Sequence, residues 1–358
     1  PNETVYPQMA DFTFYGGIYR DVTVLGVEES HFDLDYYGAP GVQVVPTMQG
    51  TDATVAATAY VTAPAGCTVH FAITNRNGDP VAEADADAAD AKTNIKIENA
   101  HLWHGTEDPY LYTLTVTLLQ NGKAVDEIAT RFGCRTIEAT PDCGLLVNHK
   151  RVLIKGVCIH HDFGCLGSAF EYSAAKRQLE ILKSMGVNSI RTGHTPPAPQ
   201  FMDLADEMGI LMDVESFDCW RRGKNLYDYG RFFDEWQEKD VAAWIRRDRN
   251  HPSLLFWCIG NEIYDTHAGS EGADTMRMLL AEVAAHDPAR NGIPTLGSNY
   301  MPWENTQHCA DIIKVAGYNY GERLYASHHE THPDWVIYGS ETSSIVPSRG
   351  IYPGHYPH

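Results

Sequence analysis

The sequence predicts a multidomain protein of β and α/β architecture, in which an immunoglobulin-like β-sandwich is followed by a (β/α)8 TIM barrel. Three observations lead to this prediction. Between residues 25 and 142, short β-like segments alternate with turn signals, as in a sandwich. After Gly144, helical and strand-like segments alternate, as in parallel β-α-β units. The apolar run at 253–260 ends in Asn261 and Glu262, which is typical of a strand that is buried on both faces.

The composition favours an acidic globular protein. The chain has 358 residues, of which 43% are hydrophobic and 21% are charged, so it can form more than one packed core. Its formal net charge of −20 argues against nucleic acid or an anionic membrane as a partner, because both are bound through basic patches. The eight cysteines are scattered without a Cys-x-x-Cys pair, which favours free, mostly buried thiols and slightly favours a cytoplasmic location. We expect no cofactor.

The first 142 residues are predicted to form β structure. Residues 1–24 hold an aromatic, glycine-punctuated segment that is too short for a domain, and we interpret it as the last part of a β domain. Residues 25–142 follow as the sandwich, with roughly seven strands. Within them, Asn77-Gly78 and Asn121-Gly122 each lie between β-like runs, where this dipeptide favours a two-residue hairpin turn.

Residues 143–358 are predicted to form the barrel, which begins with a hairpin at 144–156. We expect helices at about 173–185, 199–208, 233–249 and 272–286, and strands at about 153–159, 187–191, 210–215, 254–260, 294–298, 313–318 and 335–340. A barrel of this class has eight strands. We therefore expect the barrel to be incomplete, with its eighth strand not in the chain.

Polar and aromatic residues follow the predicted strands, at the end of a β/α barrel that usually holds the chemistry. Two apolar strands end at Glu262 and Glu341, which places two carboxylates over one pocket. Glycoside hydrolysis needs one protonated carboxyl group and one ionised carboxylate, so we predict these two residues as a catalytic pair. A sugar also needs hydrogen-bond partners and aromatic faces. The candidates that follow the strands are Arg191, His194, Trp220, Asn261, Tyr318 and the pair His161 and Asp162.

The segment His160-His161-Asp162 also suggests a metal site. Adjacent residues of a strand point to opposite faces, so His160 and His161 are poorly placed to share one ion. We therefore predict no metal, and a metal-dependent hydrolase remains the weaker alternative.

Several motifs, in their order along the chain, resemble glycoside hydrolase family 2, which includes β-galactosidases, β-glucuronidases and β-mannosidases. These motifs are spread over nearly the whole chain and lie at 14–22, 109–112, 132–135, 154–157, 188–197, 250–262 and 338–344. The resemblance implies that residues 1–24 are the remnant of a jelly-roll sugar-binding domain. It also implies that the chain is part of a longer polypeptide, truncated at both ends.

The resemblance implies a retaining β-glycosidase with defined residue roles. Glu262 matches the family's acid/base and Glu341 its nucleophile, while Asn261 would bind the 2-hydroxyl group of the sugar. Arg191 and Tyr318 match positions that orient and tune the nucleophile. His161, Asp162 and His194 match positions that line the subsite for the cleaved sugar. Retention would place the two carboxyl groups about 5–5.5 Å apart, and burial together with the charge of Glu341 would raise the pKa of Glu262.

The segments 194–197 and 342–344 look more like those of the β-galactosidase members, so we expect a β-galactoside as the substrate. The alternatives are a β-glucuronidase or β-mannosidase of the same family, or a catalytically weak carbohydrate-binding fragment. Family members often form homo-oligomers, so we consider a homo-oligomer as well.

Overall fold

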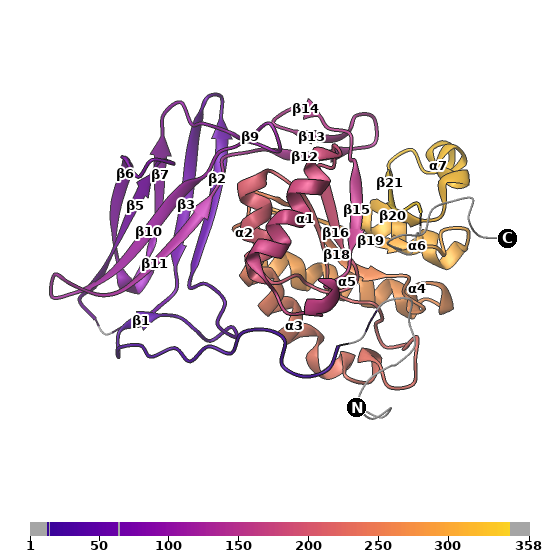
Figure 1. Ribbon diagram of the computed structural model, residues 1–358, viewed down its shortest axis with the longest axis horizontal. Coiled ribbons are helices and arrows are strands. Elements are labelled where there is room, and N and C mark those ends of the chain that lie inside the picture. The colour runs from indigo at the N-terminus through magenta and orange to yellow at the C-terminus, as the bar shows by residue number, and fades with distance from the viewer. Residues whose placement is uncertain (1–12, 14, 64, 344–358) are drawn as a thin grey trace.

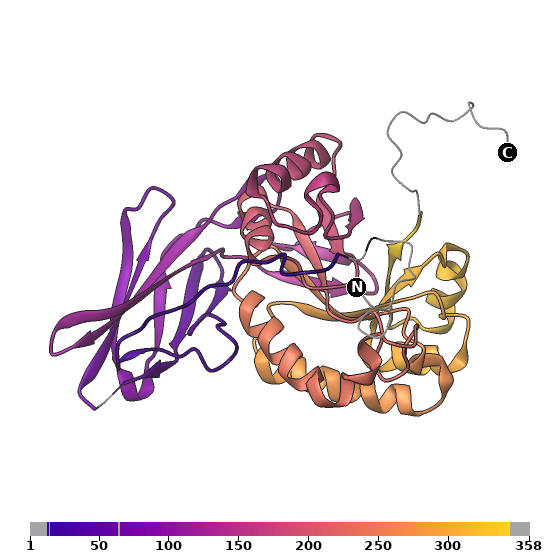
Figure 2. The ribbon, with the colours of Figure 1, turned by 60° about the horizontal axis from the view of Figure 1, so that its bottom comes forward.

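The computed structural model describes residues 13, 15–63 and 65–343 of the chain. A β-sandwich lies at one end of the molecule, and a curved parallel sheet covered by helices lies at the other (Figures 1 and 2). Residues 15–30 form no helix or strand and run from the barrel towards the sandwich. Most of the predicted jelly-roll remnant at residues 1–24 lies outside the described residues.

The sandwich consists of two antiparallel sheets, of four and three strands. Residues of β3 (Asp52–Ala59) alternate between buried and half-buried positions, because successive side chains of a strand point to opposite faces. The larger sheet has the order β11-β10-β5-β6 and contains β5 (Cys67–Thr74), β6 (Pro80–Asp87), β10 (Tyr112–Gln120) and β11 (Lys123–Phe132). The smaller sheet contains β2 (Val42–Gln49), β3 (Asp52–Ala59) and β7 (Lys92–Ile97).

Both predicted hairpins are present, but only the second has a two-residue turn, because residues 75–79 lie between β5 and β6. The first joins β5 to β6, and the second joins β10 to β11 with Asn121 and Gly122 at φ values of 52° and 74°. Two short strand pairs and a 3-10 helix complete this part of the molecule. They are β1 (His31–Phe32) with β4 (Val61–Thr62), β8 (Trp103–His104) with β9 (Asp108–Pro109), and η1 (Ala88–Asp90).

A three-stranded sheet connects the sandwich to the barrel. It contains β12 (Ile137–Thr140), β13 (Gly144–Val147) and β14 (Lys150–Arg151). Residues Asn148 and His149 have positive φ and turn β13 into β14. This is the hairpin that we expected before the first barrel strand. The boundary predicted at residues 142 and 143 falls between β12 and β13.

The barrel region has seven parallel strands in chain order, from β15 to β21. Every residue of the central strand β18 is buried, as expected for a parallel sheet that is covered on both faces. The strands are β15 (Gly156–Ile159), β16 (Ser189–Thr192), β17 (Leu211–Glu215), β18 (Leu254–Asn261), β19 (Ile293–Ser298), β20 (Val315–Asn319) and β21 (Val336–Glu341). All seven predicted strands are present, and no eighth barrel strand occurs among the described residues.

Helices lie outside the strands, as Figure 1 shows. The four predicted helices are present as α1 (Tyr172–Ser184), α2 (Pro199–Met208), α3 (Phe233–Asp248) and α5 (Glu271–His286). Three helices were not predicted: α4 (Asp265–Ala268), α6 (Glu304–Ile313) and α7 (Tyr325–Thr331). The 3-10 helices are η2 (Gly164–Leu166), η3 (Tyr229–Arg231) and η4 (Glu322–Leu324).

The sandwich and the barrel are joined by buried polar contacts. The side chain of Asn250 accepts a hydrogen bond from the backbone N–H of Val44 at 3.0 Å and donates one to the carbonyl of Val42 at 2.9 Å. Strand β2 is an edge strand, so Asn250 satisfies backbone groups that have no strand partner on that side. The indole of Trp103 donates to the carbonyl of Asp206 at 3.0 Å.

The cysteine prediction is confirmed for all eight residues, which are free thiols, five of them buried. Within the described part of the chain, no helix is long and apolar enough to cross a membrane.

Candidate active site

The backbone conformation of Gly260 and Glu262 determines how Glu262 is positioned at the end of β18. The strand ends at Asn261, and Glu262 then adopts a φ of +46°, which a non-glycine residue rarely does. Its backbone N–H donates to the carbonyl of Gly297 at 2.8 Å and so anchors the turn to β19. Gly260 permits the turn, because a Cβ there would lie 2.6 Å from the side chain of Ile263. Unusual backbone conformations of this kind are concentrated at functional sites.

Arg191, at the end region of β16, holds the site together. Its Nη1 donates to Oε1 of Glu341 at 2.7 Å, and its Nη2 pairs with Oε2 of Glu215. The side chain is only 5% exposed. Burial disfavours the charged form, but Glu215 outweighs burial and keeps the pKa of Arg191 above its ordinary value. The predicted pairing of this arginine with the nucleophile candidate is therefore present in the structure.

Asn261 and Asn319 form a bridge between the two glutamates. Oδ1 of Asn261 accepts from Nη2 of Arg191 and from Nδ2 of Asn319, each at 2.9 Å. Asn319 also donates to Oε1 of Glu262 at 3.0 Å. A chain of hydrogen bonds thus runs from Glu341 through Arg191, Asn261 and Asn319 to Glu262. The separation of 5–5.5 Å between the carboxyl groups stays a prediction.

The side chain of Asn261 is 2% exposed, and its hydrogen-bonding capacity is used by protein groups. Besides its two acceptor contacts, its Nδ2 donates to Asp218 at 2.9 Å and lies 3.3 Å from Nε2 of His194. A sugar 2-hydroxyl group would have to replace one of these contacts. The role predicted for Asn261 in binding that hydroxyl stays a prediction.

Glu262 has the environment of a general acid. Burial raises its pKa most, and the charge of Glu341 raises it further, while Asn319 and Lys224 lower it; the net effect is an increase. The predicted direction is confirmed, with burial as the larger cause. A carboxyl group of this kind keeps its proton to a higher pH than an ordinary glutamate.

Glu341 is held by two donors on its two oxygens. Arg191 binds Oε1, and the hydroxyl of Tyr320 donates to Oε2 at 2.7 Å. Tyr320 also has a positive φ, of 54°, and its N–H donates to the backbone carbonyl of Glu341 at 2.7 Å. The prediction that Tyr318 orients the nucleophile is wrong, because its hydroxyl lies 2.8 Å from Nδ1 of His328. Tyr318 is fully buried, whereas Tyr320 makes the expected contact.

Glu215 was not among the predicted site residues, although it pairs with two of them. Its carboxylate is fully buried and pairs with Arg191 and with Nδ1 of His194, the latter at 2.6 Å. Burial alone would raise its pKa, but these two cations lower it below the ordinary value. Burial lowers the pKa of His194, yet Glu215 more than compensates, so the pKa of His194 is raised. A carboxylate on the same strand face, Asp213, accepts from the hydroxyl of Tyr338 at 3.0 Å.

His161 and Asp162 lie at the rim of the site. Nδ1 of His161 is 3.4 Å from the hydroxyl of Thr195, and its ring stacks on Tyr19 at a centroid distance of 6.0 Å. Burial lowers the pKa of His161, and Arg20 lowers it further. Asp162 accepts a hydrogen bond from the N–H of Gly164 at 2.6 Å. Neither residue contacts Glu262 or Glu341 through any hydrogen bond within the described residues.

The prediction that Trp220 contacts the substrate is wrong. The indole is fully buried, and its N–H donates to the carbonyl of Ile259 at 2.9 Å. It therefore belongs to the hydrophobic core of the barrel, where it packs near Gly260. A tryptophan with no exposed face offers no surface for stacking with a sugar.

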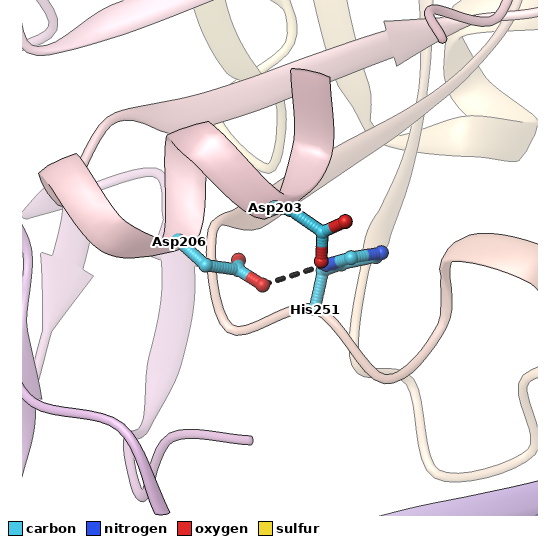
Figure 3. Close-up of side chains that lie close together, drawn as sticks. All are labelled: Asp203, Asp206 and His251. Atoms are coloured by element: carbon cyan, nitrogen blue, oxygen red, sulfur yellow. Dashed lines mark hydrogen bonds and ion pairs between the residues drawn. The ribbon is translucent and has the colours of Figure 1, made fainter. Parts of the chain in front are cut away.

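The segment His160-His161-Asp162 does not form a group with metal-ligand spacing. One such group occurs among the described residues, namely Asp203, Asp206 and His251 (Figure 3). Its ligand atoms are already used: Oδ2 of Asp206 lies 2.6 Å from Nδ1 of His251, and Oδ1 of Asp206 accepts from the N–H of Ser253 at 3.0 Å. We interpret this group as an ion pair that fastens α2 to the start of β18.

A cavity of about 1000 Å³ shares His194 and Asp218 with the candidate site. Its lining includes His161, His194 and Asp218 of the barrel and Arg131 of the sandwich. Glu262 and Glu341 do not line it. The two carboxylates therefore lie next to this cavity and not inside it.

The arrangement can perform acid-assisted displacement at a glycosidic bond. It has one carboxyl group whose pKa is raised, mainly by burial, and one carboxylate held between Arg191 and Tyr320. These are the two groups that glycoside hydrolysis requires.

Comparisons with known proteins show the family to which the chain belongs. The sequence model "Glycosyl hydrolases family 2, TIM barrel domain" matches residues 139–327, and "Glycosyl hydrolases family 2" matches residues 40–135. A β-galactosidase of Bacteroides ovatus is 35% identical over 288 residues, which are 72% of this chain and 34% of the relative. A β-glucuronidase of Bacteroides fragilis is 29% identical over 299 residues, which are 80% of this chain and 43% of the relative.

The crystal structure of a family 2 glycosyl hydrolase from Bacteroides cellulosilyticus matches with a TM-score of 0.80 and 32% identity. The match covers 88% of this chain and 41% of that structure. The chain thus spans less than half the length of each of these relatives. Together, the family models cover the sandwich, the barrel strands up to β20 and Glu262, and on this basis the chain belongs to glycoside hydrolase family 2.

Proposed function

We propose that this chain forms the catalytic part of a retaining β-glycosidase that removes terminal β-linked sugars by double displacement. Glu341 attacks the anomeric carbon, and Glu262 gives its proton to the departing oxygen. In the second step, water attacks the anomeric carbon and displaces Glu341, while Glu262 takes a proton from that water. The observation that supports this proposal most strongly is the difference between the surroundings of the two glutamates. Burial raises the pKa of Glu262, whereas Arg191 and Tyr320 bind the two oxygens of Glu341.

Each residue of the surrounding network has a role in this mechanism. Arg191 and Tyr320 each bind one oxygen of Glu341 and hold the carboxylate in place for attack. After attack, the ester at Glu341 carries no negative charge, so one of the influences that raise the pKa of Glu262 is lost. Glu262 then becomes a better base for the second step.

We further propose a neutral sugar, most simply a β-galactoside. A glucuronidase must bind the substrate's carboxylate with cationic groups. Among the described residues, the cations nearest the catalytic pair are already matched: Arg191 with Glu215 and Glu341, and Lys224 with Asp218 at 2.6 Å. This pairing leaves the neutral sugar as the simpler fit, although relatives of both classes match the chain.

The test is a panel of 4-nitrophenyl β-glycosides (galactoside, glucuronide, glucoside and mannoside) with the wild-type chain and Glu341→Gln. We expect turnover of the galactoside and a loss of at least about 10³-fold in Glu341→Gln, because the amide is a poor nucleophile. Glu322→Gln is the matched control, since this glutamate lies on the neighbouring η4 and not in the site.

Turnover that survives in Glu341→Gln would overturn the assignment of the nucleophile. Turnover of the glucuronide alone would replace the proposed sugar and leave the mechanism intact. A chain that binds a galactoside without turning it over, with equal affinity in Glu341→Gln, would be a carbohydrate-binding module.

A further inference from the structure

A cluster of four aromatic side chains lies beyond Glu262 on the barrel rim. Tyr264 and His267 come from the segment that follows β18, and Tyr300 and Trp303 come from the segment that follows β19, the neighbouring strand. The ring of His267 lies 4.3 Å from that of Tyr300 and 4.6 Å from that of Trp303, and the rings of Tyr264 and Tyr300 are 6.1 Å apart, between centroids. We call these four residues the rim cluster.

The rim cluster presents aromatic surface to solvent in a fixed position. Trp303 is 52% exposed and Tyr264 is 36% exposed. The backbone N–H of Trp303 donates to the carbonyl of Tyr300 at 2.9 Å. The neighbouring Met301 is buried in one hydrophobic cluster with Tyr318 of β20, which anchors the segment to the barrel. Single exposed aromatic residues are common on protein surfaces, but a patch of four neighbouring rings is typical of a binding site.

The rim cluster is also next to the catalytic acid. Tyr264 is two residues beyond Glu262, and the charge of Glu262 acts on the hydroxyl of Tyr300, whose pKa is raised to about 12 by burial, by Tyr264 and by Glu262. Burial and Arg222 lower the pKa of His267, so its ring is neutral at neutral pH and the patch stays uncharged. A neutral aromatic surface suits the apolar face of a ring better than a charged ligand.

The proposed mechanism determines which part of a bound substrate lies next to the rim cluster. In the proposed function, on which this inference depends, Glu262 gives its proton to the glycosidic oxygen. The cleaved sugar lies over Glu341, so the leaving group must extend from that oxygen on the side of Glu262. We propose that the rim cluster is the leaving-group subsite and stacks the flat face of the aglycone, which is either an aryl ring or the C–H face of a second sugar.

The test compares three substrates that share one sugar and differ in the leaving group: the methyl glycoside, the 4-nitrophenyl glycoside and a disaccharide. They are assayed with the wild type and Trp303→Ala. Trp236→Ala is the matched control, because this tryptophan is also exposed, at 39%, but lies on α3. Circular dichroism confirms that each variant is folded.

We expect Trp303→Ala to lower kcat/KM for the 4-nitrophenyl glycoside, the disaccharide or both by about 5- to 10-fold, the range of one aromatic stacking contact. The methyl glycoside should be unaffected, because a methyl group is too small to reach the rim. A loss with the aryl substrate alone identifies an aryl aglycone, and a loss with the disaccharide alone identifies a sugar. Equal losses for all three substrates, or no loss for any, would overturn the proposal.

Failure of the proposed function would look different, as absence of turnover of every substrate by the wild type. The subsite would then be tested by saturation-transfer NMR with 4-nitrophenyl β-galactoside. Transfer to the nitrophenyl protons that disappears in Trp303→Ala and persists in Trp236→Ala supports the rim cluster. Equal transfer in both variants refutes it.

Discussion

At the scale of single residues, the pKa of Glu262 decides how far the activity extends to alkaline pH. The first step needs protonated Glu262, so activity falls as the pH rises through its pKa. Lys224 lowers this pKa. Lys224→Met should therefore raise it and shift the alkaline limb of kcat/KM upwards, by up to about one pH unit. A pH–rate profile measures the shift.

Lys239→Met is the control for this experiment, because Lys239 faces the ring of Trp236 on α3 and carries the same charge away from the site. Its profile should match the wild type. A downward shift in Lys224→Met, or equal shifts in both variants, would show that Glu262 does not control the alkaline limb.

Tyr320 and Tyr318 make a second residue-scale prediction, since they are two positions apart and have opposite surroundings. Tyr320→Phe removes one of the two donors to Glu341, and we expect kcat to fall by about 10- to 100-fold. Tyr318→Phe removes a buried hydrogen bond to His328, so it should cost about 1 kcal/mol of unfolding free energy and little activity. Steady-state kinetics and urea unfolding of both variants distinguish the roles. Loss of activity in Tyr318→Phe alone would restore the role inferred from the sequence.

These two tyrosines also show where inference from the sequence reaches its limit. Glu262 and Glu341 could be predicted, because an apolar run that ends in a carboxylate marks a buried strand and its exit. In a regular strand, Tyr318 and Tyr320 would share one face. The positive φ of Tyr320 breaks this alternation and turns its hydroxyl to Glu341. No pattern of residue types in the sequence predicts this positive φ at Tyr320.

Elements were predictable where apolar residues formed a continuous run, as in β18, or a stripe at helical spacing, as in α3. The site residue Glu215 was missed because nothing in the sequence pairs it with Arg191; only the parallel register of β16 and β17 brings them together. Trp220 was misassigned for a related reason. The segment after β17 folds back over the barrel, so a side chain that follows a strand end becomes part of the core.

At the scale of elements, the ion pair of Figure 3 fastens α2 to the segment before β18. Burial lowers the pKa of His251, but the charge and hydrogen bond of Asp206 outweigh burial and raise it from 6.5 to about 9. Because the pKa is higher in the folded state, this pair stabilises the fold fully below pH 6.5, and the stabilisation is lost as the pH rises through 9. The contribution is about 3 kcal/mol.

We expect His251→Gln to remove this dependence. The difference in unfolding free energy between wild type and variant should decrease by about 3 kcal/mol from pH 6.5 to pH 9. Urea unfolding at several pH values measures it. His308→Gln, at a side chain that is 60% exposed, is the control and should show no such trend. A difference that stays constant with pH would mean that folding does not raise the pKa of His251.

At the scale of the whole molecule, the question is whether the sandwich and the barrel unfold as one unit. The two parts share buried polar groups: Asn250 of the barrel satisfies the edge of β2, and Arg246 lies over the ring of Tyr36 at 3.5 Å. The polar groups of Asn250 and Val44 are cut off from water at this contact, so separating the two parts would expose unsatisfied backbone groups. We therefore expect a single cooperative unfolding transition.

Asn250→Ala tests this expectation, because it removes both hydrogen bonds to β2 and should cost about 2–4 kcal/mol. Native-state hydrogen exchange reports the free energy of unfolding separately for amides of β10 in the sandwich and of β18 in the barrel. If the parts unfold together, the slowest amides of both strands lose protection by the same amount. A loss confined to β10 would contradict a single unit, since the barrel would then keep its stability without the contact. Asn94→Ala, at an exposed position of β7, is the control that should leave both strands unchanged.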